Sequence, residues 1–416
     1  MYEKNGVENI MKTTTRISFI DNLKIFLSLT VIAHHAGQAY GGSNGFWYVK
    51  DYWEPANLGP FFGVNSAFNM SLYFLISAYF IPFALEKKGS REFLKDRFNR
   101  LGIPLLFGFL ILIPCLMYFY YINFRGYQYI SFWNYYTTIY FGGGEQPTNW
   151  TGPSWPDMNF GHLWFIEHLL LYSILYLVWK LVTKKSKIRF VNFTATHLSL
   201  VSFVVIVSII TYIVRIKYPI DHWMGLLGII QTELAHLPQY VSFVLVGLIA
   251  ARNKWVQNIP RKVGVLWLLI GTVLSTLYLL GYIPGSRGGT GSRAMFYALY
   301  ETTLCTGLGV GLLYLFHTKL NKGKELLRKL AENTYTVYII HIPILVLLQY
   351  GFTYFHISGS AKFLLVFVLG TFISHLCSYY IIRRVPVFSM VFSGTSKIIK
   401  TGNHSNFNDR NRGARG

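Results

Sequence analysis

Apolar runs of about bilayer length recur along the whole chain, and they constrain its fold more than any other feature. Ten candidate spans occur, at 17–36, 60–84, 101–122, 162–183, 197–216, 236–251, 263–283, 294–317, 334–352 and 361–385. A helix of about 20 apolar residues crosses roughly 30 Å of hydrocarbon, and backbone groups buried in lipid must pair within the segment. The sequence therefore predicts an all-α polytopic integral membrane protein with about ten transmembrane helices.

The composition supports a membrane protein. Charged residues make up only 13% of the 416 residues, and hydrophobic residues make up 52%; soluble domains have about 25% charged residues. The net charge of +21 would suit a nucleic-acid binder if it were clustered. It lies instead in the short segments between apolar runs, where orientation and anionic lipids account for it. We expect the lipid bilayer as a partner and no nucleic acid.

The positive charges also predict the orientation. Of the 38 Lys and Arg, 30 fall in segments on the same side as the N-terminus and seven on the other side. By the positive-inside rule, both termini are cytoplasmic and the chain is a multi-pass protein of the plasma (inner) membrane. The first apolar run has no cleavage site after it and is expected to be a signal anchor. The predicted parts are a cytoplasmic segment at 1–16, a membrane domain at 17–390 and a basic, disordered tail at 391–416.

Several segments between the spans allow more than one interpretation. The sixth span is short, and the stretch WMGLLGIIQTELAHL before it fits a re-entrant or interfacial piece. The outer segment 123–160 is rich in Tyr and Trp, which suits either an aromatic belt or a surface that packs on sugar rings. PGSRGGTGSR at 284–293 lacks the spacing of a phosphate-binding loop and is expected to be a linker. The three cysteines have no metal-ligand spacing, and no metal site is predicted.

The first span carries the most unusual polar residues: Asp21, Lys24 and the adjacent pair His34 and His35. Residues eleven apart on an ideal helix differ by about 20° in direction and about 16 Å along the axis. Lys24 and His35 therefore share one face, with His35 near the outer end, whereas His34 points roughly 80° away. Ionisable groups inside a span often mark a pathway. A snorkelling Lys24 and a purely structural histidine pair remain alternatives.

Other spans also carry polar residues near their ends. Arg97 and Arg100 are three residues apart just inside the membrane, where they could hold phosphates or provide ordinary positive-inside charge. The further candidates are His162, Trp164, Glu167 and, two residues before a proline, His341.

Taken in order, these motifs resemble the membrane-bound acyltransferase family 3 over roughly residues 16–390. Asp21 and the spacing Lys24-x10-His35 are similar to the opening of that family, which usually has Arg where this chain has Lys24. Arg97 and Arg100 match its Arg-x-x-Arg motif. HLWFIEHLLLY resembles its mid-chain Trp segment, and TYTVYIIHIPIL resembles its Tyr-x-x-x-His-x-Pro segment. HHAGQAYG most resembles the branch of glucans biosynthesis protein C-like O-acyltransferases.

The resemblance implies an O-acyltransferase with acyl-CoA as donor substrate and no permanently bound cofactor. An acetyl or succinyl type of group would pass from the cytoplasm to a hydroxyl of an extracytoplasmic carbohydrate or cell-envelope glycan. His35 would be the general base or a transient acyl acceptor. Asp21 and Glu167 would orient or balance its imidazole. The remaining residues would bind the two substrates: Lys24, Arg97 and Arg100 the donor, and His34, His162, Trp164 and His341 the substrate near His35.

Two other function classes fit parts of the sequence. Many spans with buried His and Glu also suit a proton-coupled transporter or polysaccharide exporter, although the two halves show no evident repeat. A non-catalytic membrane scaffold would leave the polar face of the first span unexplained. The sequence does not specify the acyl group, the acceptor glycan or the oligomeric state.

Overall fold

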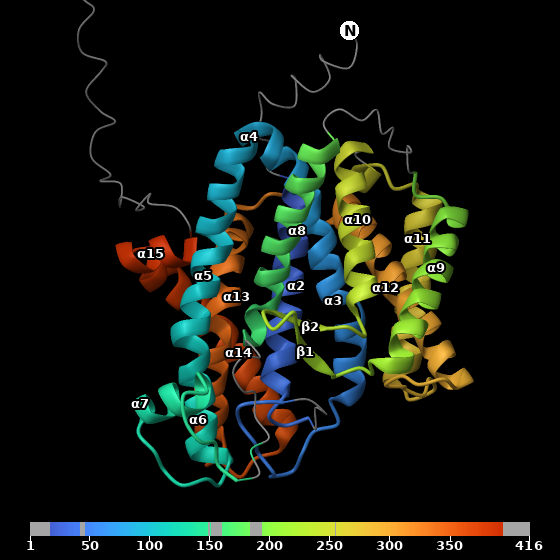
Figure 1. The fold of residues 1–416 in the computed structure, drawn as a ribbon. Coiled ribbons are helices and arrows are strands. Elements are labelled where there is room, and N and C mark those ends of the chain that lie inside the picture. Colours follow the sequence, from blue (N-terminus) through green and yellow to red (C-terminus); the bar gives the residue numbers. More distant parts are fainter. Residues whose placement is uncertain are drawn as a thin grey trace, which may run out of the picture.

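The fold is a bundle of long helices with one short hairpin between them (Figure 1). The computed structural model describes residues 17–41, 46–148, 150, 160–183, 194–253 and 255–393. The predicted N-terminal segment and almost all of the predicted tail lie outside these residues. The helices and strands, in chain order, are α2 (Ser18–Gly37), α3 (Gly59–Tyr79), α4 (Ile81–Arg97), α5 (Ile103–Phe107), α6 (Ile113–Phe124), α7 (Phe132–Asn134), α8 (Trp164–Val182), α9 (His197–Lys217), β1 (Trp223–Leu226), β2 (Ile230–Glu233), α10 (Leu237–Asn253), α11 (Arg261–Leu279), α12 (Ser292–Lys319), α13 (Glu325–Phe352), α14 (Gly359–Cys377) and α15 (Pro386–Ser393).

Short π-helical and 3₁₀ segments complete the helical elements. The π-helices are η1 (Phe98–Gly102), η2 (Gly108–Leu112), η3 (Tyr135–Tyr140) and η7 (Ser378–Ile382), and the 3₁₀ turns are η4 (Gly161–Leu163) and η6 (Trp255–Gln257).

Eight helical segments in the described part of the chain are long and apolar enough to cross a membrane. They are Gly59–Tyr79, Ile81–Phe124, Gly161–Val182, His197–Lys217, Arg261–Leu279, Ser292–Lys319, Glu325–Phe352 and Gly359–Ile382. Two predicted spans are not among them: α2, whose polar residues lower its hydropathy, and α10, which has only 17 residues. A nearly all-α membrane protein is therefore confirmed, whereas the count of ten spans and the cytoplasmic termini remain predictions.

Prolines explain the irregular stretches of the long segment Ile81–Phe124. The π-helices η1 and η2 lie just before Pro104 and Pro114, each of which stands near the start of the next α-helix. Proline has no N–H and its ring clashes with the carbonyl four residues earlier. Those carbonyls belong to Arg100 and Leu110, and each needs another donor because it lies in a protein interior or in lipid.

Tyrosine side chains from elsewhere in the bundle supply these donors. The Tyr335 hydroxyl on α13 donates to the Arg100 carbonyl, and the Tyr136 hydroxyl donates to the Leu110 carbonyl over 3.0 Å. The prolines thus loosen the helix locally, and the freed carbonyl groups attach it to neighbouring elements.

Close helix packing depends on small residues at two crossings. A Cβ on Gly247 of α10 would lie 2.3 Å from the Leu75 carbonyl oxygen of α3, and one on Gly307 of α12 would lie 2.8 Å from the Gly271 nitrogen of α11. Membrane helices gain packing energy where glycine lets backbones approach. These two crossings hold α3 against α10 and α11 against α12.

The stretch predicted to be re-entrant or interfacial forms an antiparallel hairpin, in which Trp223 pairs with Glu233 and Leu226 with Ile230. Leu227 and Gly228 turn the chain with φ values of 57° and 73°, the left-handed conformation that tight hairpin turns require. Figure 1 shows the hairpin between the long helices, midway along them.

Candidate active site

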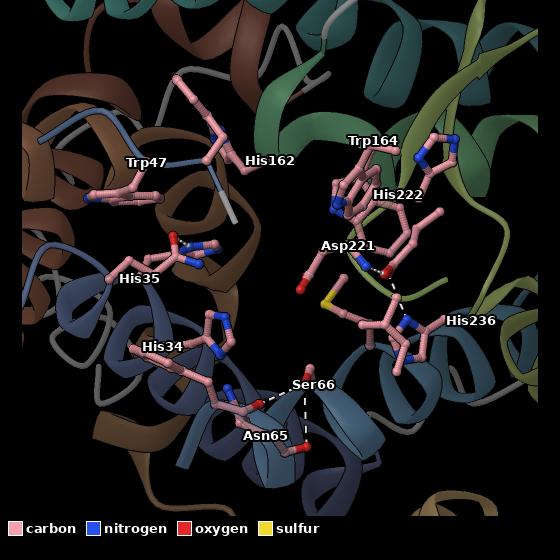
Figure 2. Close-up of a pocket in the computed structure, with 18 of the residues that line it drawn as sticks. His34, His35, Trp47, Asn65, Ser66, His162, Trp164, Asp221, His222 and His236 are labelled. Atoms are coloured by element: carbon pink, nitrogen blue, oxygen red, sulfur yellow. Dashed lines mark hydrogen bonds and ion pairs between the residues drawn. The ribbon is translucent and has the colours of Figure 1, made fainter. Parts of the chain in front are cut away.

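A cavity of about 1090 Å³ opens between the helices and the hairpin. Figure 2 shows two groups of side chains facing one another across it. The first group, here called the histidine wall, is His34, His35, Trp47 and His162. The second, here called the hairpin wall, is Trp164, Asp221, His222, Trp223, Glu233 and His236. The cavity is large enough for a drug-sized ligand and more.

His35 is held from two directions on the histidine wall. Its ring stacks on Trp47 with centroids 5.3 Å apart and planes 9° apart. Its Nδ1 lies 3.4 Å from the Gln38 side-chain oxygen, which can only accept, so we assign the proton to Nδ1. The other ring nitrogen, Nε2, then carries a lone pair, which is the state that a general base needs.

Gln349 on α13 fixes both the helix that carries His35 and the indole that stacks on it. Its side chain is fully buried. The amide nitrogen donates to the carbonyls of His35 and Ala36 over 2.9 and 3.0 Å, and the amide oxygen accepts from the Trp47 indole over 2.8 Å. Sequence reasoning missed Gln349; the only signal was an amide inside the apolar run IPILVLLQY.

His162 and His341 continue the row of imidazoles behind His35. The His341 ring centroid lies 5.3 Å from those of both His35 and His162. His162 Nε2 donates to the Ile339 carbonyl over 2.9 Å, which is the carbonyl that Pro343 deprives of its helical partner. The His341-x-Pro343 motif therefore positions His162 as well as bending a helix.

His341 and His34 each keep a ring nitrogen without a protein partner among the described residues. His341 Nδ1 lies 2.6 Å from the Tyr338 carbonyl and donates to it, which leaves its buried Nε2 unpaired. The Nδ1 of His34 is likewise buried and unpaired. The rings of His34 and His35 are 81° apart in orientation, yet both line the cavity.

A row of polar residues on α3 lies below His34 (Figure 2). Asn65 donates to the Thr30 carbonyl over 3.0 Å, and Asn69 donates to the Asn65 side-chain oxygen over the same distance. Ser66 donates to the Phe62 carbonyl over 2.6 Å. Sequence reasoning did not single out these residues, although three small polar residues within five positions of an apolar run were a readable signal.

The residues predicted to bind the donor are Lys24, Arg97 and Arg100, and none of them lines the cavity. Lys24 lies near the start of α2, whereas His35 lies near its end. Arg97 lies over the Phe93 ring at 5.0 Å, and Arg100 forms an ion pair with Asp96 at 2.9 Å. Arg97 ends α4, and Arg100 lies in the π-helix η1 that follows it.

Lys24 and Asp21 are also remote from His35. The Lys24 ammonium lies 3.9 Å from the Asp21 carboxylate and 4.7 Å from the centre of the Phe80 ring. Asp21 and His35 are fourteen residues apart on one helix, which is about 21 Å along the axis. Asp21 therefore cannot contact the His35 imidazole as the resemblance implied.

One face of α13 connects the arginine end to the histidine wall. Tyr335 and Tyr338 are three residues apart, and His341 follows three residues later, so the three share one stripe. Tyr335 donates to the Arg100 carbonyl and Tyr338 donates to the His162 carbonyl. The stripe rises by about 9 Å along α13.

Glu167 binds the hairpin rather than a histidine. Its carboxylate accepts from the Gln231 backbone N–H over 3.1 Å, and it is not among the residues that line the cavity. Trp164, one turn earlier on α8, does line the cavity and has its ring centroid 5.4 Å from that of Trp223. The two residues predicted from the same motif therefore do different things: Trp164 faces the site, and Glu167 anchors the hairpin backbone.

A chain of buried charged groups holds the hairpin from the other side. Glu233 pairs with His236 at 2.6 Å, His236 with Glu301 at 3.0 Å, and Glu301 with Arg215 at 2.5 Å. All four side chains are nearly fully buried. Sequence reasoning missed them, because only Glu233 and His236 are close in the sequence, whereas His236 and Glu301 are 65 residues apart and Arg215 lies on a further helix.

Two other segments between predicted spans also contribute residues to the cavity. The expected linker 284–293 contributes to the cavity lining and accepts from the Ile220 N–H through the Arg287 carbonyl over 2.7 Å. In the described part of the aromatic segment 123–160, Arg125 is the residue that lines the cavity before Gly161. No group of three or more His, Cys, Asp or Glu able to hold a metal ion occurs among the described residues.

Comparisons with known proteins agree with the geometry. The acyltransferase domain family matches residues 17–383. Glucans biosynthesis protein C of Escherichia coli O139:H28 (strain E24377A / ETEC) is 24% identical over 391 residues, which cover 90% of this chain and 94% of the relative. The protein of the same name from Escherichia coli (strain K12) has the same identity and coverage. The chain therefore belongs to the acyltransferase domain family, and it is a membrane acyltransferase.

Proposed function

We propose that the chain moves a small acyl group, of the acetyl or succinyl type, from cytoplasmic acyl-CoA to a hydroxyl of an extracytoplasmic glycan. One observation carries this proposal: His35 lines the cavity with its Nδ1 beside the Gln38 oxygen, which leaves Nε2 as the nitrogen with the lone pair, while Trp47 and Gln349 hold its ring and backbone. A base in a fixed tautomer beside a water-accessible cavity suits proton removal from a hydroxyl. The relatives named for glucans biosynthesis favour a carbohydrate as the acceptor.

The reaction needs no other proton donor or acceptor. The glycan hydroxyl gives its proton to His35 Nε2 while its oxygen attacks the thioester carbonyl carbon. The C–S bond then breaks, the acyl group stays on the glycan oxygen, and the leaving thiolate takes the proton back from the imidazolium. His35 ends uncharged and ready for another cycle. A transient acyl group on His35 is the alternative route, and both routes use the same nitrogen.

The donor would enter from the cytoplasmic end. Arg97 and Arg100 carry guanidinium groups that suit CoA phosphates, and the Arg100–Asp96 pair is exposed enough to exchange for a phosphate at little cost. Lys24 offers a point charge without the planar fork of the usual arginine. The Tyr335–Tyr338 stripe would guide the thioester toward His35. In this proposal both termini lie in the cytoplasm and the chain spans the inner membrane.

The test is acyl transfer by the purified full chain. The protein in lipid nanodiscs receives radiolabelled acetyl-CoA or succinyl-CoA and the deacylated envelope-glycan fraction of a strain that lacks the gene. We expect label to appear in the glycan in proportion to enzyme and time. A transporter would neither transfer nor hydrolyse the label, and that result would overturn the proposal.

A further inference from the structure

The hairpin wall is a built surface that the acyl-transfer chemistry of His35 does not use. Figure 2 shows Asp221 reaching into the space between the walls, and its backbone has a φ of 66°. A non-glycine residue in this conformation is uncommon and persists where the surroundings fix it. Here the Asp221 N–H donates to Glu233 over 2.6 Å, and the carboxylate accepts from Arg287 over 2.9 Å.

The position of the hairpin indicates contact with a polar ligand or water. Strand edges carry unpaired backbone groups, which are tolerated at membrane depth only where they are buried in protein or line a water-filled cavity. Glu167 occupies one such group, the Gln231 N–H, and Trp223, Met224 and Gly225 line the cavity. A helix would satisfy its backbone groups internally at this depth, whereas the short sheet leaves edge groups that need a polar partner.

The hairpin is also held more firmly than a simple loop. The ion pairs among Glu233, His236, Glu301 and Arg215 fix it to α9 and α12, and the Arg215 side chain also donates to the Ala235 carbonyl over 3.0 Å. Ligand-binding groups keep their geometry only when such supporting contacts hold them.

The side chains presented to the cavity form an aromatic corner beside a carboxylate. The Trp164 and Trp223 rings meet at 64°, and Trp223 is 41% exposed. Indole faces pack on the apolar faces of sugar rings, and an ionised carboxylate accepts two hydroxyl hydrogens. The Asp221–Arg287 ion pair is exposed and costs little to rearrange.

We propose that Trp164, Trp223 and Asp221 form the subsite that binds a neutral pyranose ring of the acceptor glycan. The proposal rests on the function proposed above and names the residues that recognise its acceptor. An anionic group on the ring would lie beside the Asp221 carboxylate, whereas ring hydroxyl groups can donate hydrogen bonds to it. The ring would lie across the cavity from His35, so that a hydroxyl on its far edge meets the base.

The test separates acceptor binding from donor binding in the full chain. Wild type, Trp223→Ala and Asp221→Asn are compared in nanodiscs, with labelled acetyl-CoA and succinyl-CoA as donors and the deacylated envelope-glycan fraction as the titrated acceptor. Asn is chosen because it tolerates the left-handed backbone of Asp221. We expect the acceptor KM to rise about tenfold in each variant, the size of effect that loss of a ring contact or a charged hydrogen bond gives, while the donor KM changes less than twofold.

Trp53→Ala is the matched control, because Trp53 is 47% exposed and does not line the cavity; it is expected to behave as wild type. A Trp223→Phe variant should recover most of the acceptor affinity. Acceptor KM values within twofold of wild type in both variants, or equal increases for donor and acceptor, would overturn the subsite while the proposed function stands. A wild-type protein that transfers no label to the glycan would overturn the proposed function, and the subsite with it.

Discussion

The two walls of the cavity are built in opposite ways. On the histidine wall the imidazoles are positioned by carbonyl and amide oxygens and by Trp47. On the hairpin wall, carboxylates, an imidazole and a guanidinium lie in one continuous set of ion pairs. Imidazole nitrogens with unpaired electrons thus occur where we propose chemistry, whereas paired charges occur where the hairpin backbone must be rigid.

The largest expected effect is on the histidine wall. His35→Ala should lower kcat for acyl transfer by about 10²–10⁴-fold, the usual contribution of a general base. His34→Ala, which removes an adjacent ring that also lines the cavity, should cost less than His35→Ala. Initial rates of label transfer to the glycan measure both. Equal losses in the two variants would contradict the assignment of the general base to His35.

The second prediction concerns stability on the hairpin wall. Arg215→Met leaves the Glu301 carboxylate buried without its guanidinium partner, which should cost about 3–5 kcal/mol of unfolding free energy. Arg287→Gln removes an exposed pair with Asp221 and should cost less than about 1 kcal/mol. The melting temperatures of the two variants are compared in detergent, with the loss of monodisperse protein on heating as the readout. Similar melting temperatures would show that the buried set of charges does not hold the hairpin.

A smaller effect is expected from Gln349, which acts on the histidine wall through other residues. Gln349→Ala should lower kcat by about tenfold to hundredfold through misplacement of the base, with both KM values nearly unchanged. Gln349→Glu keeps the oxygen that accepts from Trp47 but loses the N–H group that donates to the His35 carbonyl. Its kcat should lie between those of wild type and Gln349→Ala. Leu347→Ala, at a 64% exposed position of the same helix, is the control. A Gln349→Ala variant with a lower kcat and raised KM values for both substrates would indicate only general structural damage.

The smallest predicted effect lies outside both walls. Arg97→Gln and Arg100→Gln should each raise the donor KM about tenfold, because each removes hydrogen bonds to a charged phosphate, and should leave the acceptor KM unchanged. Arg91→Gln, an exposed position on the same helix, controls for net charge. Donor KM values that do not move would limit the arginines to an ordinary role in membrane orientation.

The sequence predicted the helical elements well because apolar runs of bilayer length are local signals. It also predicted that His34, His35, His162 and Trp164 would be near the site, and all four line the cavity. It did not predict which partners they would meet. Pro343 can be read as a helix breaker, but nothing local says that the freed Ile339 carbonyl accepts from His162.

The remaining differences come from long-range contacts. Glu301 meets His236 across 65 residues, and no spacing rule connects them. Asp21 and Glu167 were assigned to the imidazole by resemblance, but the axial rise of α2 removes Asp21 from it, and the hairpin backbone takes Glu167. The hairpin was predicted only as a re-entrant or interfacial piece, since two four-residue strands give too short a pattern to be recognised.

One measurement tests the central claim most directly: transfer across a sealed membrane. The full chain is reconstituted in tight liposomes with the deacylated envelope-glycan fraction trapped inside and labelled acetyl-CoA or succinyl-CoA added only outside. The account predicts label in the trapped glycan with the wild-type protein and none with His35→Ala. Label that reaches the glycan only when donor and acceptor share one side would contradict it.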